Sequence, residues 1–128
     1  MANEEVLTYL QDILDAINDM QSCFVDFPNR YDLFENDIMR RCVVERKVEI
    51  MGEAINRIRK SDASVEIPNA RAIIDTRNRI IHAYDNVQPE FLWSLVIRHI
   101  PELKKDIERI IVIYEEQYNI ENASDNRE

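Results

Sequence analysis

The chain contains one glycine, Gly52, and only four prolines among its 128 residues. Sandwiches, barrels and nucleotide-binding α/β sheets use glycine and proline at the tight turns between their strands. Loops that cradle phosphates need several glycines close together, which excludes P-loop and Rossmann-type nucleotide binding for this chain. The scarcity of both residues therefore disfavours β-rich and α/β folds before any element is located.

Two long stretches carry apolar residues at alternating spacings of three and four, the pattern of an amphipathic helix. The first begins at Asn3 and ends before Pro28, with apolar residues at Val6, Leu10, Ile13, Ile17, Met20 and Phe24. The second begins between Asp32 and Asn36 and extends toward Lys60, with apolar residues at Val44, Val48, Met51, Ile55 and Ile58. Two such helices joined by a short loop predict an antiparallel hairpin, and a glycine inside the second favours a close helix crossing.

Three further helices are predicted in the second half of the chain. A third helix carries Ile73, Ile74, Ile80 and Ile81 and ends around Tyr84 to Asn86. Proline suits a first helical turn, so Pro89 predicts a fourth helix to about Arg98 and Pro101 a fifth to about Tyr118. We therefore expect an all-α, up-and-down bundle of about five helices in one domain, residues 1–120. Residues 121–128 are polar and predict a disordered tail.

Charge and composition limit the possible partners and compartments. The net charge of −9 opposes non-specific binding to nucleic acid or anionic membranes, so any RNA contact must be local. No apolar run is long enough to span a bilayer, and the N-terminus does not resemble a signal peptide, so we expect a soluble, cytoplasmic protein. Cys23 and Cys42 are interpreted as two buried thiols. Neither His82 nor His99 has a second ligand at metal-binding spacing, so neither a metal nor another cofactor is expected.

The segment from residue 75 to 84 holds most of the residues suited to chemistry: Arg77, Asn78, Arg79, His82 and Tyr84. A histidine can transfer the proton of a ribose 2′-OH, and an arginine can bind the phosphate and stabilise its transition-state charge. This pair is sufficient for metal-free RNA cleavage that leaves a 2′,3′-cyclic phosphate. Arg77 and His82 lie roughly 140° apart around a continuous helix, which favours a two-fold dimer whose copies each contribute one residue. A structural role for these side chains is the alternative reading.

The spacing of Arg77, His82 and Tyr84 resembles the RxxxxHxY signature of HepT-like toxins in the HEPN superfamily, which are all-helical proteins of this size. Residues 45–54, which include a Gly-Glu-Ala triplet, are similar to the family's second-helix block. The order of Pro68, Trp93 and Pro101 around the signature also follows the family. The resemblance covers nearly the whole predicted fold.

The resemblance implies a homodimeric, metal-independent ribonuclease that acts as the toxin of a toxin–antitoxin module. Arg77 and His82 would be catalytic, with Asn78 and Arg79 beside them as substrate-binding residues. The expected partner is a MntA-like minimal nucleotidyltransferase that neutralises the toxin by transferring AMP onto Tyr84. Ala83 departs from the family, where relatives often have glycine, and it leaves these side chains unchanged.

Two other functions are compatible with the sequence. The first is a non-catalytic helical subunit that dimerises, docks a nucleotidyltransferase and presents substrate to it. A net charge of −9 suits that role better than it suits a nuclease. The second is a family member with an intact fold and no activity. Incubation of the purified protein with RNA in EDTA separates a nuclease from both.

Overall fold

The computed structural model describes residues 2–82 and 88–125, and helices are the only regular elements in these two ranges. Their order is α1 (Ala2–Ser22), α2 (Tyr31–Glu35), α3 (Ile38–Ser61), α4 (Ala70–His82), α5 (Pro89–Ser94), the π-helical segment η1 (Leu95–His99) and α6 (Ile100–Asp125). The predicted all-α class is therefore confirmed. No helix within the two ranges has the length and apolar character needed to cross a lipid bilayer.

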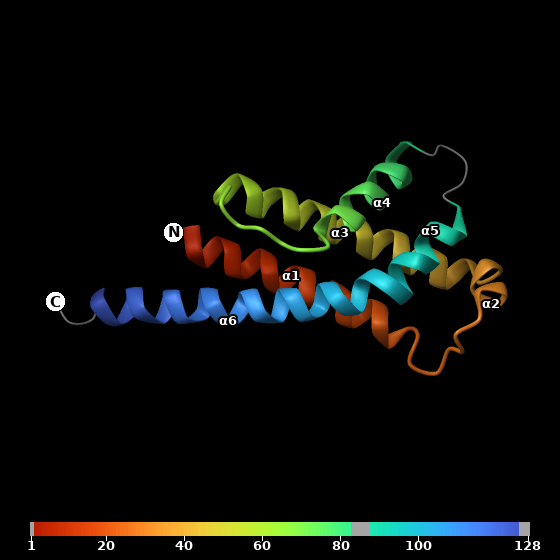
Figure 1. The fold of residues 1–128 in the computed structure, drawn as a ribbon, viewed down its shortest axis with the longest axis horizontal. Coiled ribbons are helices and arrows are strands. Elements are labelled where there is room, and N and C mark those ends of the chain that lie inside the picture. The colour runs from red at the N-terminus through yellow and green to blue at the C-terminus, as the bar shows by residue number, and fades with distance from the viewer. Residues whose placement is uncertain (1, 83–87, 126–128) are drawn as a thin grey trace.

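Three long helices form the body of the bundle (Figure 1). Helix α1 runs antiparallel to both α3 and α6 and packs against each of them. Helix α4 is shorter and lies against α3, while α5 and η1 lead into α6 at the end of the bundle near α2. The α1–α3 pair is the antiparallel hairpin predicted from the apolar spacing.

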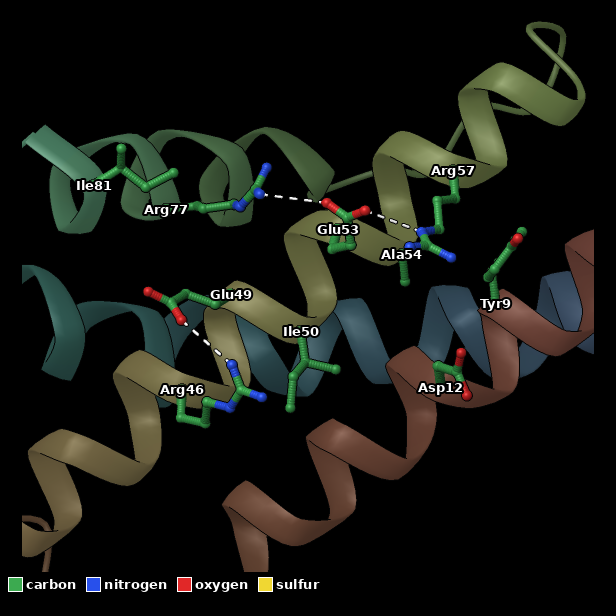
Figure 2. A pocket seen from close by; sticks show the side chains of 10 residues that line it. All are labelled: Tyr9, Asp12, Arg46, Glu49, Ile50, Glu53, Ala54, Arg57, Arg77 and Ile81. Carbon is green, nitrogen blue, oxygen red and sulfur yellow. Dashed lines mark hydrogen bonds and ion pairs between the residues drawn. The ribbon is translucent and has the colours of Figure 1, made fainter.

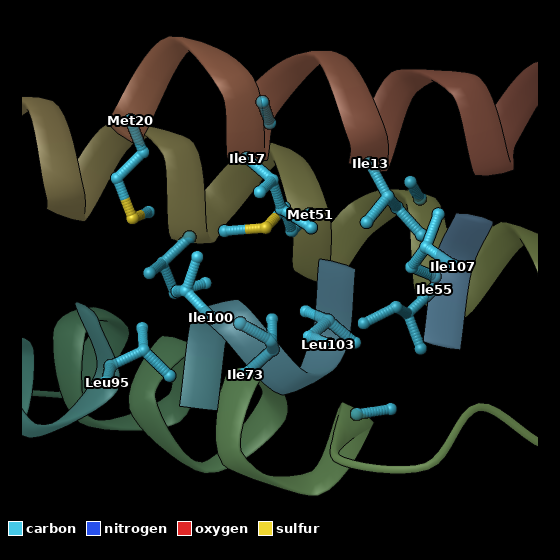
Figure 3. Packing of buried hydrophobic residues seen from close by; sticks show 14 of the residues in the cluster. Ile13, Ile17, Met20, Met51, Ile55, Ile73, Leu95, Ile100, Leu103 and Ile107 are labelled. Carbon is cyan, nitrogen blue, oxygen red and sulfur yellow. The ribbon is translucent and has the colours of Figure 1, made fainter. Parts of the chain in front are cut away.

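The hydrophobic core lies where the apolar faces of α1 and α3 meet α4 and α6 (Figure 3). The predicted apolar positions of α1 from Val6 to Met20 are completely buried, as are those of α3 from Val44 to Ile58. Helix α4 contributes Ile73, and α6 contributes the fully buried Ile100, Leu103 and Ile107. Each such side chain contributes about 1.5–3 kcal/mol by burial. The spacing of three and four residues therefore identifies the buried faces of the long helices α1 and α3.

The second predicted helix begins later than expected. The sequence predicted a start between Asp32 and Asn36, but that stretch forms the separate one-turn helix α2, and α3 begins at Ile38. Asp37 is the N-cap of α3, because its side-chain Oδ1 accepts a hydrogen bond from the backbone N–H of Arg40 at 3.0 Å. An aspartate that satisfies a free N–H at this point makes it the favoured start of the helix.

The predicted break at Pro101 is wrong, because α5, η1 and α6 follow one another without interruption from Pro89 to Asp125. Proline has no N–H to donate to the carbonyl one turn earlier, and its ring crowds that carbonyl. Here the helix widens just before the proline: the N–H of Ile100 bonds the carbonyl of Leu95, five residues back. The π-helical turn of η1 thus accommodates Pro101 within a continuous helix.

Helix α6 extends beyond residue 120, where the sequence analysis placed the end of the domain. Residues 121–125, which the sequence analysis assigned to a disordered tail, continue α6. The side chain of Asn3 in α1 donates a hydrogen bond to Glu121 Oε1 at 2.8 Å, which joins the start of the chain to the end of α6. Residues 126–128 lie outside the described range.

An aromatic cluster holds α5 against the α1–α3 connection. Phe24, Phe27 and Phe34 surround Trp93 of α5, with ring centroids 5.1–6.2 Å from the indole. The guanidinium of Arg40 lies 4.6 Å from the centroid of the Phe27 ring. These contacts fix the position of α5, which follows α4 in the chain, relative to α2 and α3.

Candidate active site

Helix α4 carries the candidate catalytic segment along the surface of α3. Its apolar face buries Ala70 and Ile73, and Thr76 is buried with its hydroxyl donating to the carbonyl of Ala72 at 2.7 Å. This packing turns Arg77 toward α3, where only 23% of its side chain is exposed. Arg77 is therefore held by the fold and not simply extended into solvent.

Gly52 provides the space in which Arg77 lies. A Cβ atom built on Gly52 would stand 2.3 Å from Arg77 Cδ and 3.2 Å from Arg77 Nε, far closer than atoms can pack. The glycine was predicted to permit a close helix crossing, and the group that lies against it is the aliphatic stem of the Arg77 side chain from α4. Any larger residue at this position would displace the arginine.

Glu53 is the carboxylate next to this arginine. Its Oε2 lies 3.4 Å from Arg77 Nη2, and its Oε1 accepts a hydrogen bond from Arg57 Nε at 2.9 Å. The hydrogen bond from Arg57 is the main cause that lowers the pKa of Glu53, and the charges of Arg57, Arg77 and Lys60 add to it. The carboxylate therefore stays ionised between two guanidinium groups.

The Nε atom of Arg77 is buried and has no hydrogen-bond partner among the described residues. A buried donor without an acceptor is uncommon, because leaving it unpaired costs about 1–3 kcal/mol. Its position follows from the way the arginine stem crosses Gly52. The terminal nitrogen that does not face Glu53 points away from α3 (Figure 2).

A cavity of about 450 Å3 opens beside Arg77, between α1, α3 and α4 (Figure 2). Its walls combine arginines and carboxylates with apolar and aromatic groups: Tyr9, Asp12, Arg46, Glu49, Ile50, Glu53, Ala54, Arg57, Arg77 and Ile81. Each arginine faces a carboxylate, since Arg46 lies 3.6 Å from Glu49 and the other two share Glu53. The formal charges of the wall therefore balance.

The remaining predicted site residues lie outside this cavity. His82 is exposed at the end of the described part of α4 and does not line the cavity that Arg77 lines. Asn78 is exposed, and Arg79 is exposed with its guanidinium 3.8 Å from the centroid of the Phe91 ring in α5. Tyr84, and the predicted end of the third helix, lie outside the described residues. The single chain thus places Arg77 against α3 and leaves His82 exposed.

Sequence reasoning did not single out Glu53, Arg57 or Tyr9. Glu53 and Arg57 are four residues apart on α3, a spacing that is typical of an exposed ion pair of little consequence. The useful signal was the position of Glu53 directly after the only glycine. In residues 2–82 and 88–125 no group of three or more histidine, cysteine or acidic side chains is placed to hold a metal ion.

Comparisons with known proteins identify relatives over most of the chain. A family model described as "Ribonuclease HepT-like" matches residues 13–110, a range that includes all of the site residues predicted from the sequence. The protein "Putative RNase MJ1380" of Methanocaldococcus jannaschii is 34% identical over 110 residues, which cover 84% of this chain and 98% of the relative. The "Probable ribonuclease HepT" of Thermococcus cleftensis is 34% identical over 109 residues, covering 80% and 92% respectively. No solved structure gives a significant match.

Proposed function

Because this chain belongs to the HepT-like ribonuclease family, we propose that it is a metal-independent endoribonuclease with Arg77 and His82 as its catalytic residues. The observation that carries the proposal is the packing of Arg77 over Gly52. Its side chain is 23% exposed, and among the described residues only one of its two terminal nitrogens has a partner, Glu53, so the other can bind an anion. The names of the relatives support RNA as the substrate, and its phosphate is the anion that Arg77 would bind.

The proposed reaction needs no group beyond these side chains and the RNA. The His82 imidazole accepts the proton of a ribose 2′-OH, and the 2′-oxygen forms a bond to the adjacent phosphorus. The bond from phosphorus to the 5′-oxygen breaks, and that oxygen takes the proton that the His82 imidazolium gives up, directly or through solvent water. Arg77 binds the non-bridging oxygens and stabilises the charge that grows on them. The products are a 2′,3′-cyclic phosphate and a 5′-hydroxyl.

We propose that two copies of the chain complete one site. Arg77 and His82 are five residues apart on α4, roughly 140° around the helix axis. Arg77 lines the cavity beside α3, whereas His82 is exposed and does not. A two-fold dimer brings the His82 of one copy to the Arg77 of the other, where both can reach one phosphate. Asn78 and Arg79 are exposed on the same helix and are proposed to contact the RNA.

The proposed biological role is that of a toxin acting in the cytoplasm and neutralised by a MntA-like nucleotidyltransferase. The transferase would attach AMP to the Tyr84 hydroxyl, which attacks the α-phosphate of ATP and releases pyrophosphate. The added phosphate would lie close in sequence to Arg77 and Arg79 and block the place of the RNA phosphate. Co-expression with the transferase is expected to add one or more AMP masses to Tyr84 and none to a Tyr84→Phe variant. Neutralisation without modification of Tyr84 would contradict this role.

The experiment that tests the nuclease is RNA cleavage by the purified protein in EDTA. Wild type is expected to cleave, and Arg77→Ala and His82→Ala are each expected to lose at least about 99% of the rate, because each removes a group needed only for chemistry. Arg71→Ala is the matched control: Arg71 lies on the same helix, its side chain is 91% exposed, and it faces Asp75. Helical circular dichroism should be the same for all four proteins.

Two results would contradict the proposal. Cleavage that persists in Arg77→Ala or His82→Ala would exclude that residue from catalysis. An absence of cleavage by the wild-type protein, combined with tight binding to a nucleotidyltransferase, would instead favour the non-catalytic docking subunit.

A further inference from the structure

We infer that Glu53 is a positioning residue, which holds the Arg77 guanidinium against Gly52 and directs the terminal nitrogen that does not face Glu53 toward the substrate phosphate. The inference rests on the proposed ribonuclease function, because it assigns the residue that prepares Arg77 for it. It concerns a contact between α3 and α4 whose two residues, Glu53 and Arg77, are 24 positions apart in the sequence.

The two oxygens of Glu53 have different partners. Oε1 accepts the shorter hydrogen bond, from Arg57 at 2.9 Å, and Oε2 faces Arg77 Nη2 at 3.4 Å. The guanidinium of Arg57 also lies 5.8 Å from the centroid of the Tyr9 ring on α1. Arg57 therefore anchors the carboxylate from one side, and the anchored carboxylate orients Arg77 on the other.

The geometry leaves Arg77 one way to bind a phosphate. Its Nε is buried over Gly52, and its Nη2 faces Glu53. The other terminal nitrogen points away from α3 (Figure 2). Without the carboxylate the guanidinium can rotate about its terminal bonds, and the fraction of molecules with this nitrogen correctly placed falls. Misplacement of a catalytic group by about 1 Å can reduce a rate by about a hundredfold.

Glu53 also has a cost for binding, which separates its role from a merely structural one. Its side chain is 51% exposed beside the place of the phosphate, so its negative charge repels RNA. Removing the charge should strengthen RNA binding while weakening catalysis. A residue that only stabilises the fold would change neither quantity in this opposed way.

The experiment compares Glu53→Gln with Asp75→Asn in steady-state cleavage of a short RNA in EDTA. Asp75 is the control because it is an exposed carboxylate on α4 that lies 3.7 Å from Arg71 and does not line the cavity. Glu53→Gln is expected to lower kcat at least about tenfold and to lower KM at the same time. Asp75→Asn is expected to keep kcat within about twofold of wild type. Equal kcat values for the two variants would overturn the inference.

A second measurement does not depend on activity. The 15N–1H NMR signal of Arg77 Nε, assigned by its loss in Arg77→Lys, is expected to lie away from the signals of exposed arginines. In Glu53→Gln it should move toward them, and in Asp75→Asn it should stay. An unmoved signal in Glu53→Gln would refute the inference even if the wild type cleaves RNA. If the wild type does not cleave but the signal moves as expected, the proposed function fails and the positioning contact stands.

A third variant covers the case in which Glu53→Gln does not fold. Glu53→Asp keeps the negative charge and withdraws it from Arg77 by one methylene. It is expected to lower kcat without lowering KM, because the repulsion of RNA remains. A kcat equal to that of wild type would refute the need for the position of this carboxylate.

Discussion

Gly52 illustrates how one residue can be unfavourable for its helix and necessary for the site. A glycine inside a helix costs about 1 kcal/mol relative to alanine. At this position alanine would place its Cβ 2.3 Å from Arg77 Cδ, whereas glycine leaves room for the arginine side chain. The local loss of stability is the condition for the close contact between α3 and α4.

The packing of Arg77 over Gly52 predicts different effects of Gly52→Ala in two backgrounds. In the wild-type background the new methyl group displaces Arg77, and we expect RNA cleavage to fall about ten- to a hundredfold without a gain in stability. In the Arg77→Ala background the space over Gly52 is empty, and the same substitution should increase the free energy of unfolding by about 1 kcal/mol. Urea unfolding of the four proteins measures this cycle. An equal gain in the free energy of unfolding in both backgrounds would show that Arg77 does not fill this space.

Tyr31 predicts a loss of stability at alkaline pH. Burial raises its pKa to about 12, and the neighbouring Glu90 and Glu35 add to the shift. Since this pKa exceeds the ordinary value of about 10, the stabilisation is complete below pH 10 and is lost as the pH rises toward 12. The hydroxyl has no hydrogen-bond partner among the described residues, so Tyr31→Phe should cost little at pH 7. Urea midpoints between pH 7 and 11.5 should fall less steeply in Tyr31→Phe than in wild type.

At the scale of the elements, the start of α3 depends on a single side chain. Asp37 accepts the backbone N–H of Arg40, and its carboxylate also pairs with the guanidinium of that residue. The backbone hydrogen bond, followed by the side-chain one, lowers the pKa of Asp37. The cap separates α2 from α3, which share no continuous helix despite lying only two residues apart.

Asp37→Ala is expected to lower the free energy of unfolding by about 1 kcal/mol, because the N–H of Arg40 loses its acceptor. Asp37→Asn keeps a capping oxygen and should lose less. The pKa of Asp37 is depressed, so the wild-type advantage over Asp37→Ala is present above about pH 4 and disappears as the pH falls below it. Thermal unfolding of the three proteins from pH 2.5 to 7 tests both statements. A constant difference across this range would mean that the carboxylate charge does not act at the cap.

For the whole molecule, the distribution of charge matters more than its sum. The net charge of −9 opposes general binding to RNA. The cavity beside Arg77 nevertheless contains three arginines, which balance its three carboxylates. The charges of this wall sum to zero, so the cavity does not share the net negative charge of the chain, and the proposed dimer would add the His82 of a second copy.

A shared site predicts that two inactive variants restore each other. In a mixture of Arg77→Ala and His82→Ala chains, each mixed dimer holds one complete pair, with Arg77 from one copy and His82 from the other. If chains exchange at random, half of the dimers are mixed and each has one site out of two, so roughly a quarter of wild-type activity should return. Cleavage assays after refolding the chains together measure this, with each variant refolded alone as the control. No recovery in a mixture shown to be dimeric would place both residues in one protomer.

The apolar period and the site signature were readable along the chain because they depend on neighbours in sequence. Spacings of three and four locate the buried faces of α1 and α3, since residues at those spacings share one side of a helix. The order of Arg77, His82 and Tyr84 pointed to the ribonuclease family for the same reason, and the family match supports it.

Contacts between distant segments depend on how the helices pack, and no local pattern encodes them. Pro101 marked a boundary by its own chemistry, yet the π-helical turn before it lets α6 continue and bury Ile100 and Leu103 in the core. In the sequence Glu53 resembles an ordinary exposed acid. In the fold Arg77 of α4 lies across Gly52, which is 25 residues earlier in the chain, and Glu53 faces its guanidinium. The space that holds the proposed catalytic arginine forms only when α3 packs against α4, because Gly52 lies on α3 and Arg77 on α4.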